Sequence, residues 1–391
     1  MAEVNLTPEL RFPEFEGVWN KVFLKDVAIF LDGQRVPLSQ TERAKKQGAY
    51  PYYGASGIID YVDDYLFDEE LVLLGEDGAN ILTRSTPLAF VVTGKIWVNN
   101  HAHVLRAKYS TPFLAESLER IRYDKYNTGT AQPKLNSEIC KSISLYFTEP
   151  EEQQKIAAFL TAVDQRIQLL QQKKAKLEEY KKGVMQQIFS QQIRFKIENE
   201  DGELVEPPDW EEKRLGEIGE IITGKTPTTS DKELWNGDID FITPTDIIDE
   251  IKYQKIVART VCETEKMRIL PIGAIVYTCI ASIGKMAITM KPSITNQQIN
   301  ALIVNEEHLN EFVYYSLLKQ TPKIKSTKAN TTLPIINKTE FSKIKIALPS
   351  LSEQKKIANF LTSLDESIES LGKQIEATTT FKKGLLQQMF V

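Results

Sequence analysis

The chain has 391 residues, enough for two or three domains, and 42% hydrophobic and 26% charged residues are typical of a globular protein. Its three cysteines are scattered, which excludes a disulfide framework and a cysteine-based zinc site. No stretch approaches the ~20 apolar residues of a membrane span, so we expect a soluble, cytoplasmic protein with no membrane partner. The net charge of −5 argues against a uniformly basic surface, although seven lysines cluster between Lys319 and Lys345.

Residues 1–150 form the first predicted domain, which is mixed α/β with short strands. Apolar runs at 71–74 and 88–92 are bounded by turn residues, as strands are, and the spacing over 113–123 is helical. His101 and His103 lie two apart on one face of a predicted strand. Because two ligands do not complete a metal site, we interpret both as core or surface histidines and predict no metal.

Residues 151–190 form the first predicted long helix, which carries a heptad pattern. Apolar residues recur at alternating spacings of four and three, and polar Lys174 and Lys181 interrupt them. Such a pattern makes one narrow apolar stripe, which is stable only against a partner stripe. The residues assigned to this stripe are Ile156, Leu160, Val163, Ile167 and Leu170.

Residues 191–350 form the second predicted domain, again mixed α/β, with a strand at 274–277 and a helix at 309–319. Its opening repeats that of the first domain at an offset of 191, with Trp19 matching Trp210 and Leu24 matching Leu215. Each domain also closes with a polar turn rich in Thr and Asn, at 127–136 and 328–337. The two domains thus have similar opening and closing segments but different sequences between them, which suggests two modules that recognise two different targets.

One motif in the second domain resembles a phosphate-binding loop. Residues 219–226 fit G-x-x-x-x-G-K-[ST], which would indicate an ATPase. The residues between the glycines are bulky and include Glu220, whereas a phosphate cradle needs small residues with converging N–H groups. Lys225 and Thr226 should open a helix, but Pro227 and a polar turn follow them. The context therefore argues against nucleotide binding.

A nuclease is the catalytic alternative. Asp238 or Asp240, together with Glu250 and Lys252, could hold Mg²⁺ at a phosphodiester. The first domain has no counterpart of this set, and the sequence has no Gly-rich methyl-donor loop. We therefore predict that the chain binds rather than catalyses, with no catalytic residues of its own.

Residues 351–391 form the second predicted long helix and repeat the first one. At an offset of 201, residues 152–189 align with 353–390 without a gap, and 17 of these 38 positions are identical. A repeat of this length indicates two half-molecules in tandem. If a two-fold relates the halves, the helices pack as an antiparallel coiled coil; the alternative is that each packs separately on its own domain. The second stripe comprises Ile357, Leu361, Leu364, Ile368 and Leu371, with Thr378 and Lys382 as interruptions.

Two glycines near the ends of these helices occupy equivalent positions, Gly183 and Gly384. Glycine is a poor helix former. We therefore expect a break at each, where the chain turns into the next module.

The repeated motifs resemble those of the specificity subunits of type I restriction-modification systems. Both long helices start with Glu-Gln-x-Lys-Ile-Ala-x-Phe-Leu and finish with Lys-Lys-Gly-x-x-Gln-Gln-x-Phe. The opening Leu-Arg-Phe-Pro-x-Phe at 10–15, Tyr-Tyr-Gly-Ala-Ser-Gly at 52–57 and Asn-Gln-Gln-Ile-Asn-Ala-Leu at 296–302 strengthen the resemblance. It covers essentially the whole chain.

The resemblance implies a bipartite DNA-binding protein with a pseudo-two-fold. Two target-recognition domains, separated by the helical pair, would each recognise one half of a split site in double-stranded DNA. Two methyltransferase subunits would dock around the helices, and restriction/translocase subunits would join the full complex. S-adenosylmethionine, ATP and Mg²⁺ are then expected on those partners, and no cofactor on this chain. A fused or stand-alone nuclease or modification enzyme, and an adaptor that binds only protein, remain alternatives.

Sequence-specific contacts need Arg, Lys, Asn, Gln, Ser or Thr on loops, where they can reach base edges and phosphates. In the first module the DNA-binding candidates are Gln34, Arg35, Lys45, Lys46, Asn127, Thr128, Gln132 and Lys134. In the second module they are Lys225, Thr226, Thr228, Thr229, Lys285, Lys328, Asn330, Thr331 and Thr332.

Overall fold

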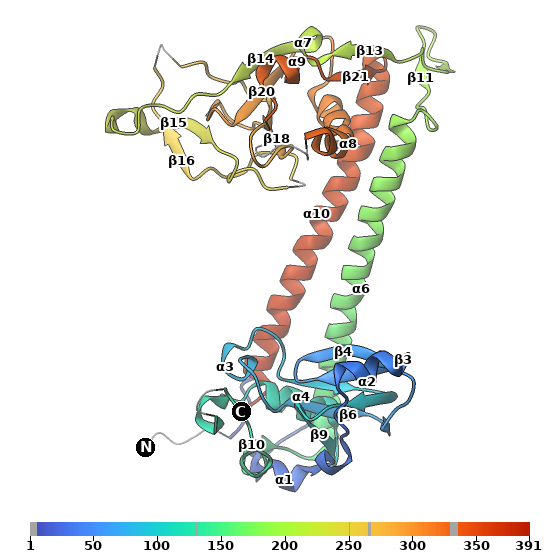
Figure 1. The fold of residues 1–391 in the computed structure, drawn as a ribbon, viewed down its shortest axis with the longest axis vertical. Coiled ribbons are helices and arrows are strands. Elements are labelled where there is room, and N and C mark those ends of the chain that lie inside the picture. The colour runs from blue at the N-terminus through green and yellow to red at the C-terminus, as the bar shows by residue number, and fades with distance from the viewer. Residues whose placement is uncertain (1–5, 130–131, 250, 265–266, 329–334) are drawn as a thin grey trace. The chain divides into compact units, whose positions relative to one another are not determined.

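The computed structural model describes residues 6–129, 132–249, 251–264, 267–328 and 335–391 (Figure 1). The chain divides into two compact units, one of residues 1–172 and 371–391 and the other of residues 173–370. Each unit thus contains one mixed α/β module, the first part of one long helix and the last part of the other. In the described parts of the chain, no helix is long and apolar enough to cross a bilayer.

The first module is built from two four-stranded sheets and one two-stranded ribbon. The ribbon pairs β1 (Asn20–Phe23) with β10 (Ser144–Phe147). One sheet has the strand order β2 (Ala28–Phe30), β9 (Ala102–Ala107), β6 (Leu71–Gly75) and β7 (Ala89–Val92). The other sheet has the strand order β4 (Gly57–Val62), β3 (Gln47–Gly54), β8 (Lys95–Val98) and β5 (Phe67–Asp68). The helices are α1 (Leu24–Val27), η1 (Asp32–Gln34), α2 (Gln40–Lys45), α3 (Asn80–Thr83), α4 (Thr111–Glu119), η2 (Tyr123–Tyr126) and α5 (Ser137–Lys141). The strands predicted at 71–74 and 88–92 are confirmed as β6 and β7. The helix predicted over 113–123 is α4, which starts earlier because the hydroxyl of Ser110 caps its first turn, and which ends at Glu119.

The second module has a four-stranded and a three-stranded sheet, with two short ribbons. The larger sheet has the strand order β14 (Gly219–Thr223), β20 (Ile299–Val304), β17 (Ile275–Thr278) and β18 (Met286–Ile288). The smaller sheet has the strand order β16 (Arg259–Val261), β15 (Trp235–Ile242) and β19 (Ser293–Thr295). The ribbons pair β13 (Glu211–Arg214) with β21 (Lys345–Leu348), and β11 (Ile197–Glu198) with β12 (Leu204–Val205). The helices are α7 (Leu215–Ile218), η3 (Lys232–Leu234), α8 (Asn310–Lys328) and α9 (Lys338–Ser342). The predicted strand at 274–277 is confirmed as β17, and the predicted helix at 309–319 extends further, as α8.

The two modules share the opening that the sequence predicts. In each, a strand, a one-turn helix and a second strand follow one another, as β1, α1 and β2 in one and β13, α7 and β14 in the other. The ring of Trp19 packs against Phe390 at a centroid distance of 5.9 Å, and Trp210 packs against Phe189 at 6.1 Å. Phe189 and Phe390 are equivalent in the repeat, so each module opening packs against the end of one long helix.

The long helices are α6 (Pro150–Phe189) and α10 (Leu351–Gln388), and each is continuous (Figure 1). The breaks predicted at Gly183 and Gly384 are therefore wrong. Glycine can keep helical dihedrals where packing holds the flanking turns, and buried Val184 and Leu385 follow the two glycines. α6 ends only at Phe189, and two residues later Gln191, with a φ of 61°, lies in the left-handed region that ends many helices.

The helices pack antiparallel within each unit, as predicted. In the first unit, Ile156 and Leu160 of α6 share a core with Leu385 of α10 and with Met389 directly after it. In the second unit, Val184 and Ile188 share a core with Ile357 and Leu361. Early residues of one helix thus meet late residues of the other. Both helices also enter the cores of the modules, so the alternative of two separately packed helices does not describe the structure.

Burial of the remaining stripe residues varies. Val163 and Leu371 are buried, whereas Ile167, Leu170, Leu364 and Ile368 are half-buried. The polar interruptions of the stripe form contacts of their own. The ammonium of Lys174 pairs with Glu178 at 3.1 Å, and the hydroxyl of Thr378 donates to the carbonyl of Gln374 at 2.7 Å.

Candidate nucleic-acid interface

In the first module, the candidate interface begins at η1, where the chain leaves β2. Gln34 is exposed there. Arg35, the next residue, has a side chain only 13% exposed, and its guanidinium donates to the Glu76 carboxylate and the Ala102 carbonyl, both at 2.7 Å. Arg35 is therefore engaged inside the module, whereas Gln34 faces solvent.

His103 lies beneath this turn and is fully buried. Its Nδ1 is 2.7 Å from a carboxylate oxygen of Asp32, and its Nε2 is 2.9 Å from the carbonyl of Leu135. Both partners are acceptors, so both ring nitrogens must carry protons. Burial opposes the charge, but the hydrogen bonds and charges of Asp32 and Cys140 together outweigh it, and the pKa of His103 is raised to about 10. His103 is thus a core histidine that ties η1 to the segment leading into α5.

The polar turn that precedes α5 holds itself together with predicted DNA-binding side chains. The carboxamide oxygen of Asn127 accepts from the backbone N–H groups of Gly129 and Lys134, at 3.0 and 2.9 Å. The hydroxyl of Thr128 donates to the carbonyl of Lys134 at 3.0 Å. Gln132 is exposed, and the ammonium of Lys134 lies 3.4 Å from Glu76. Asn127 and Thr128 thus shape the turn, whereas Gln132 projects from it.

The other two candidates of the first module lie at the end of α2. Lys45 is exposed. The ammonium of Lys46 lies 3.6 Å from Asp63 and 5.7 Å from the ring centroid of Trp97. Lys45 therefore has the more open position for a phosphate contact.

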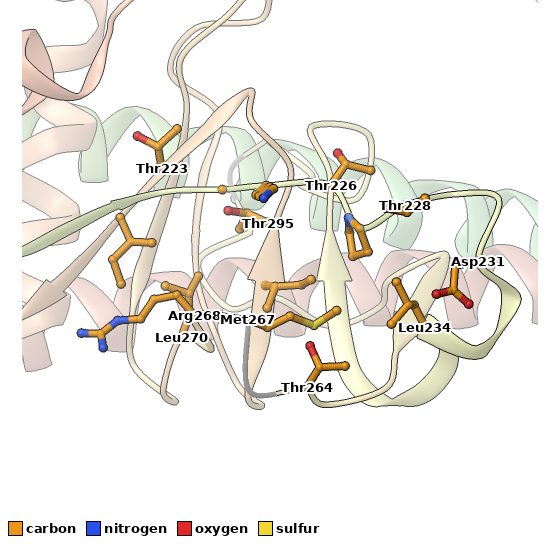
Figure 2. A pocket seen from close by; sticks show the side chains of 15 residues that line it. Thr223, Thr226, Thr228, Asp231, Leu234, Thr264, Met267, Arg268, Leu270 and Thr295 are labelled. Carbon is orange, nitrogen blue, oxygen red and sulfur yellow. The ribbon is translucent and has the colours of Figure 1, made fainter.

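In the second module, three of the candidates lie at a cleft of about 750 Å³. Figure 2 shows the segment carrying Thr226 and Thr228 along one side of it and the side chains of Thr264 and Met267 on the other. The lining residues are Ile222, Thr223, Gly224, Lys225, Thr226, Pro227, Thr228, Asp231, Leu234, Thr264, Met267, Arg268, Leu270, Ile294 and Thr295. Three predicted DNA-binding residues, Lys225, Thr226 and Thr228, are thus brought together at one concave surface.

The segment after β14 is held in place by close packing. A Cβ added to Gly224 would lie 2.2 Å from the carbonyl oxygen of Asn296, so only glycine fits. The hydroxyl of Thr226 donates to the side-chain carbonyl of Gln297 at 2.8 Å, and the carbonyl of Thr228 accepts from the indole N–H of Trp235 at 3.2 Å. Lys225 and Thr229 remain exposed on this fixed segment.

Sequence reasoning missed the opposite wall of this cleft. Arg268 is two-thirds exposed there and pairs with Glu220 of β14 at 2.6 Å. Thr264 and Met267 also line this wall. The segment carries no turn signature of Gly, Pro or Asn, and its place opposite β14 depends on tertiary structure. The sequence feature that could have pointed to this wall is Arg268, which directly precedes an apolar stretch.

The other candidates of the second module lie elsewhere. Lys285 is outside the cleft, at the turn between β17 and β18, and its ammonium lies 3.4 Å from the carbonyl of Ile247. Lys328 is the last residue of α8. Asn330, Thr331 and Thr332 fall outside the described residues.

The two catalytic motifs of the second module take part in ordinary folding contacts. Glu220 to Thr223 lie in β14, which pairs antiparallel with β20, so the segment between Gly219 and Gly224 is strand and not a phosphate loop. Lys252 is buried, and its ammonium donates to the hydroxyl of Thr362 on α10 at 2.6 Å. Asp240 lies within β15, and Glu250 is outside the described residues.

Comparison with known proteins places both modules in one family. The family model of the type I restriction modification DNA specificity domain matches residues 16–179 and again residues 207–379. The chain belongs to this family. Each match spans most of one module and runs into the long helix that follows it, so the specificity domain occurs twice in tandem.

Curated relatives carry the same family description. The chain is 32% identical over 212 residues to the type I restriction enzyme MjaIX specificity subunit of Methanocaldococcus jannaschii, covering 52% of this chain and 49% of that protein. It is 34% identical over 179 residues to the HindI specificity subunit of Haemophilus influenzae, covering 42% and 38%. The chain thus spans about half the length, or less, of these relatives.

Solved structures share the fold over nearly the full length. The S subunit of a type I restriction-modification system from M. genitalium matches with a TM-score of 0.66 and 18% identity, covering 98% of this chain and 99% of that one. A second structure, described as showing complex assembly and conformational transition of the type I system, matches with a TM-score of 0.54 and 18% identity, covering 95% and 96%. The two-module architecture with two long helices is therefore that of a specificity subunit.

Proposed function

We propose that this chain is the DNA-recognition subunit of a type I restriction-modification complex in the cytoplasm. One module recognises one half of a split site, and the other module recognises the other half. The observation that carries this proposal is that the specificity domain occurs twice. The two copies share their opening elements and their long helices but carry different candidate DNA-binding residues. A protein with two equivalent frames and unlike recognition surfaces suits a bipartite, asymmetric DNA sequence.

The long helices set the distance between the half-sites. α6 contains 40 residues, which at ~1.5 Å per residue corresponds to roughly 60 Å of helix. One turn of B-DNA is ~34 Å, so a helix of this length is compatible with half-sites more than one turn apart. The helices also dock two methyltransferase subunits, which in turn bring the restriction/translocase subunits.

The exposed members of the candidate set make the DNA contacts. In the first module these are Gln34, Lys45 and Gln132; the engaged side chains beside them, such as Arg35 and Asn127, position the turns. In the second module the contacts come from the cleft, with Lys225 and Arg268 on its two walls. The lysines hold phosphates, and the amide and hydroxyl side chains hydrogen-bond base edges.

Catalysis belongs to the partners, which bind S-adenosylmethionine, ATP and Mg²⁺. The strand conformation of 219–223 and the contact of Lys252 with Thr362 support this division, because neither candidate motif has the surroundings of an active site. The alternative is a stand-alone nuclease or modification enzyme, in which the purified chain would cleave or methylate DNA by itself.

Exchange of one module tests the proposal. Residues 16–149 are replaced by the equivalent segment of another specificity subunit, the hybrid is expressed with its methyltransferase, and the methylated sites of the host genome are mapped. We expect one half of the site to change while the other half and the gap stay the same. Methylation of the unchanged site, or DNA cleavage by the purified chain alone, would contradict the proposal.

A further inference from the structure

Of the two histidines in the first module, only His103 is buried in the core. His101 lies in the turn between β8 and β9, and half of its side chain is exposed. Its Nδ1 lies 2.8 and 3.0 Å from the two carboxylate oxygens of Asp77. Because a carboxylate only accepts hydrogen bonds, Nδ1 carries a proton. Nε2 lies on the far side of the ring, and within the described residues it has no hydrogen-bond partner.

The turn that carries His101 is fixed by hydrogen bonds on both sides. The backbone N–H of His101 donates to the side-chain oxygen of buried Asn99 at 2.8 Å. The backbone N–H of Asn99 in turn donates to the carbonyl of Tyr53 at 3.1 Å. The carbonyl of His101 accepts from the backbone N–H of Glu76 at 2.8 Å. The imidazole ring is therefore presented to solvent from a rigid support.

Asp77 comes from a second fixed segment, which follows β6. It forms an isolated antiparallel bridge with Lys134, and the N–H of the next residue, Gly78, donates to the carbonyl of Pro133 at 3.0 Å. Gly78 has a φ of 106°, a value that favours glycine and lets the chain turn directly after Asp77. Asp77 thus joins the turn of His101 to the polar turn at 127–136.

Arg35 and Glu76 connect three turns at this end of the module. The guanidinium of Arg35, directly after η1, donates to Glu76 and to the carbonyl of Ala102, which follows His101, both at 2.7 Å. The ammonium of Lys134 brings the turn at 127–136 to the same carboxylate, at 3.4 Å. A satisfied polar network of this kind holds its members in one geometry. The exposed polar side chains on these turns, one from each, are Gln34, His101 and Gln132.

Stability alone does not account for the pair of His101 and Asp77. At the other end of the same two strands, Arg106 of β9 pairs with Glu69, which precedes β6, at 2.6 Å. Both pairs are partly exposed, and such pairs contribute little to stability. A histidine that is paired through Nδ1 differs from arginine in keeping one ring nitrogen for a second partner. The Asp77 end of the strands therefore offers a hydrogen-bonding atom to a molecule outside the chain.

We propose that His101 is a specificity-determining residue of the first module, with Asp77 as its positioning residue. Nε2 of His101 hydrogen-bonds the edge of one base in the half-site that this module recognises. In the neutral ring Nε2 accepts from the amino group of adenine or cytosine, and in the charged ring it donates to guanine. Asp77 keeps the proton on Nδ1, so each charge state of the ring has one polarity at Nε2. The inference rests on the proposed function, because that function supplies the DNA.

The test compares the two ends of the strands. His101→Ala and Asp77→Asn are matched by Arg106→Ala and Glu69→Gln, and each full chain is expressed with the methyltransferase subunit of its own system before the methylated sites are mapped. We expect His101→Ala to accept all four bases at one position of the first half-site. Asp77→Asn should relax the same position, because a carboxamide can donate as well as accept and so permits both ring tautomers. The two control variants should keep the wild-type site.

Affinity measurements on the purified complexes separate base recognition from folding. For His101→Ala, the ratio of affinities for the correct and the substituted base at that position should fall about tenfold or more. A loss of affinity that is equal for all sequences would indicate a phosphate contact or a folding defect and would overturn the assignment. Melting temperatures should match those of the two control variants, and His101→Gln, which keeps a polar side chain, provides the same comparison if alanine lowers them.

Failure of this inference can be told apart from failure of the proposed function. If the wild-type complex methylates a split site and both His101 variants keep the same site, only the assignment of His101 is wrong. If the wild-type complex methylates no split site, the proposed function is wrong and the inference falls with it.

Discussion

Lys382 of α10 donates to Asp164 of α6 at 2.9 Å, and the equivalent residues of the repeat, Lys181 and Asp365, form the same ion pair in the other unit. The helices have opposite roles in the two pairs: the lysine comes from α10 in the first unit and from α6 in the second. This reciprocity is what a two-fold relation between repeated helices requires. It also explains why lysines occupy positions where a heptad would otherwise carry apolar residues, since each lysine fixes the register of the antiparallel pair.

Removing Lys382 should destabilise the first unit. Its ammonium also lies 3.1 Å from Glu116, and although burial opposes the charge, the hydrogen bond to Asp164 raises its pKa. Lys382→Met leaves two carboxylates without their cation. We expect a loss of about 1 kcal/mol in the free energy of unfolding, less than for a fully buried pair because Asp164 is half exposed. Urea unfolding measures this loss, and Lys383→Met, at the exposed neighbouring position, should leave the midpoint unchanged.

His103 should make stability depend on pH in the alkaline range. Its pKa is about 10 in the folded protein against 6.5 for an unperturbed histidine. Because the folded pKa is the higher one, this stabilisation is fully present below pH 6.5 and is lost as the pH rises through about 10. The free energy of unfolding of the wild type should therefore fall over this window.

The control for this pH effect is His103→Gln, whose carboxamide does not titrate. Its unfolding free energy should be lower at pH 6.5 and should change less between pH 6.5 and 10 than that of the wild type. Parallel pH profiles for the two proteins would show that His103 is not the titrating group.

The exposed polar residues of the first module should differ in the kind of defect they cause. Gln132→Ala or Gln34→Ala, if the side chain contacts a base, should cost about 1–3 kcal/mol of binding and relax one position of the half-site. Lys45→Ala should weaken binding to all sequences alike and reduce the salt dependence, as expected for a phosphate contact. Affinity measurements on a library of single-base variants distinguish the two patterns. The half-site of the second module is the internal control, since it should not change.

Lys225→Ala should leave the ATP dependence of the assembled complex intact. Lys225 follows a β-strand and does not open a helix, and it lies on the wall of the cleft, so under the proposed function it contacts a DNA phosphate and not a nucleotide. We expect weaker DNA binding and an unchanged ATP requirement in a cleavage assay. Loss of ATP binding by the isolated chain upon this substitution would reinstate the nucleotide-binding interpretation.

Lengthening the helices should lengthen the gap in the DNA site. A heptad inserted after Leu170, with a matching heptad after Leu371, keeps both stripes in phase and adds about 10 Å of rise. That corresponds to roughly three base pairs at ~3.4 Å each. Methylome mapping should then show the same half-site bases with a longer unspecified gap. An insertion of two residues, which rotates the stripe by about 200° to the opposite face of the helix, is the control that should abolish methylation.

Local and repeated features of the sequence predicted the fold well. The heptads, the repeat at 201 residues and the shared Trp openings sufficed for two α/β modules and an antiparallel helical pair. The expected breaks at Gly183 and Gly384 failed because helix propensity is weak against the packing of Val184 and Leu385. Residue type alone could not show that Gln34 is exposed while Arg35 is engaged inside the module, because the hydrogen-bond partners of Arg35 are 41 and 67 residues away in the sequence. Arg268 was missed for the same reason.

The stacking of Phe390 on Phe113, at a centroid distance of 5.2 Å, has a consequence for how the protein is made. Trp19 and Phe113 lie in a core whose closing residues leave the ribosome only after the entire second module. Part of the apolar interior of the first module therefore stays uncovered until synthesis has passed residue 390. A chain interrupted by a nonsense codon or a stalled ribosome would leave this apolar surface exposed to chaperones and proteases.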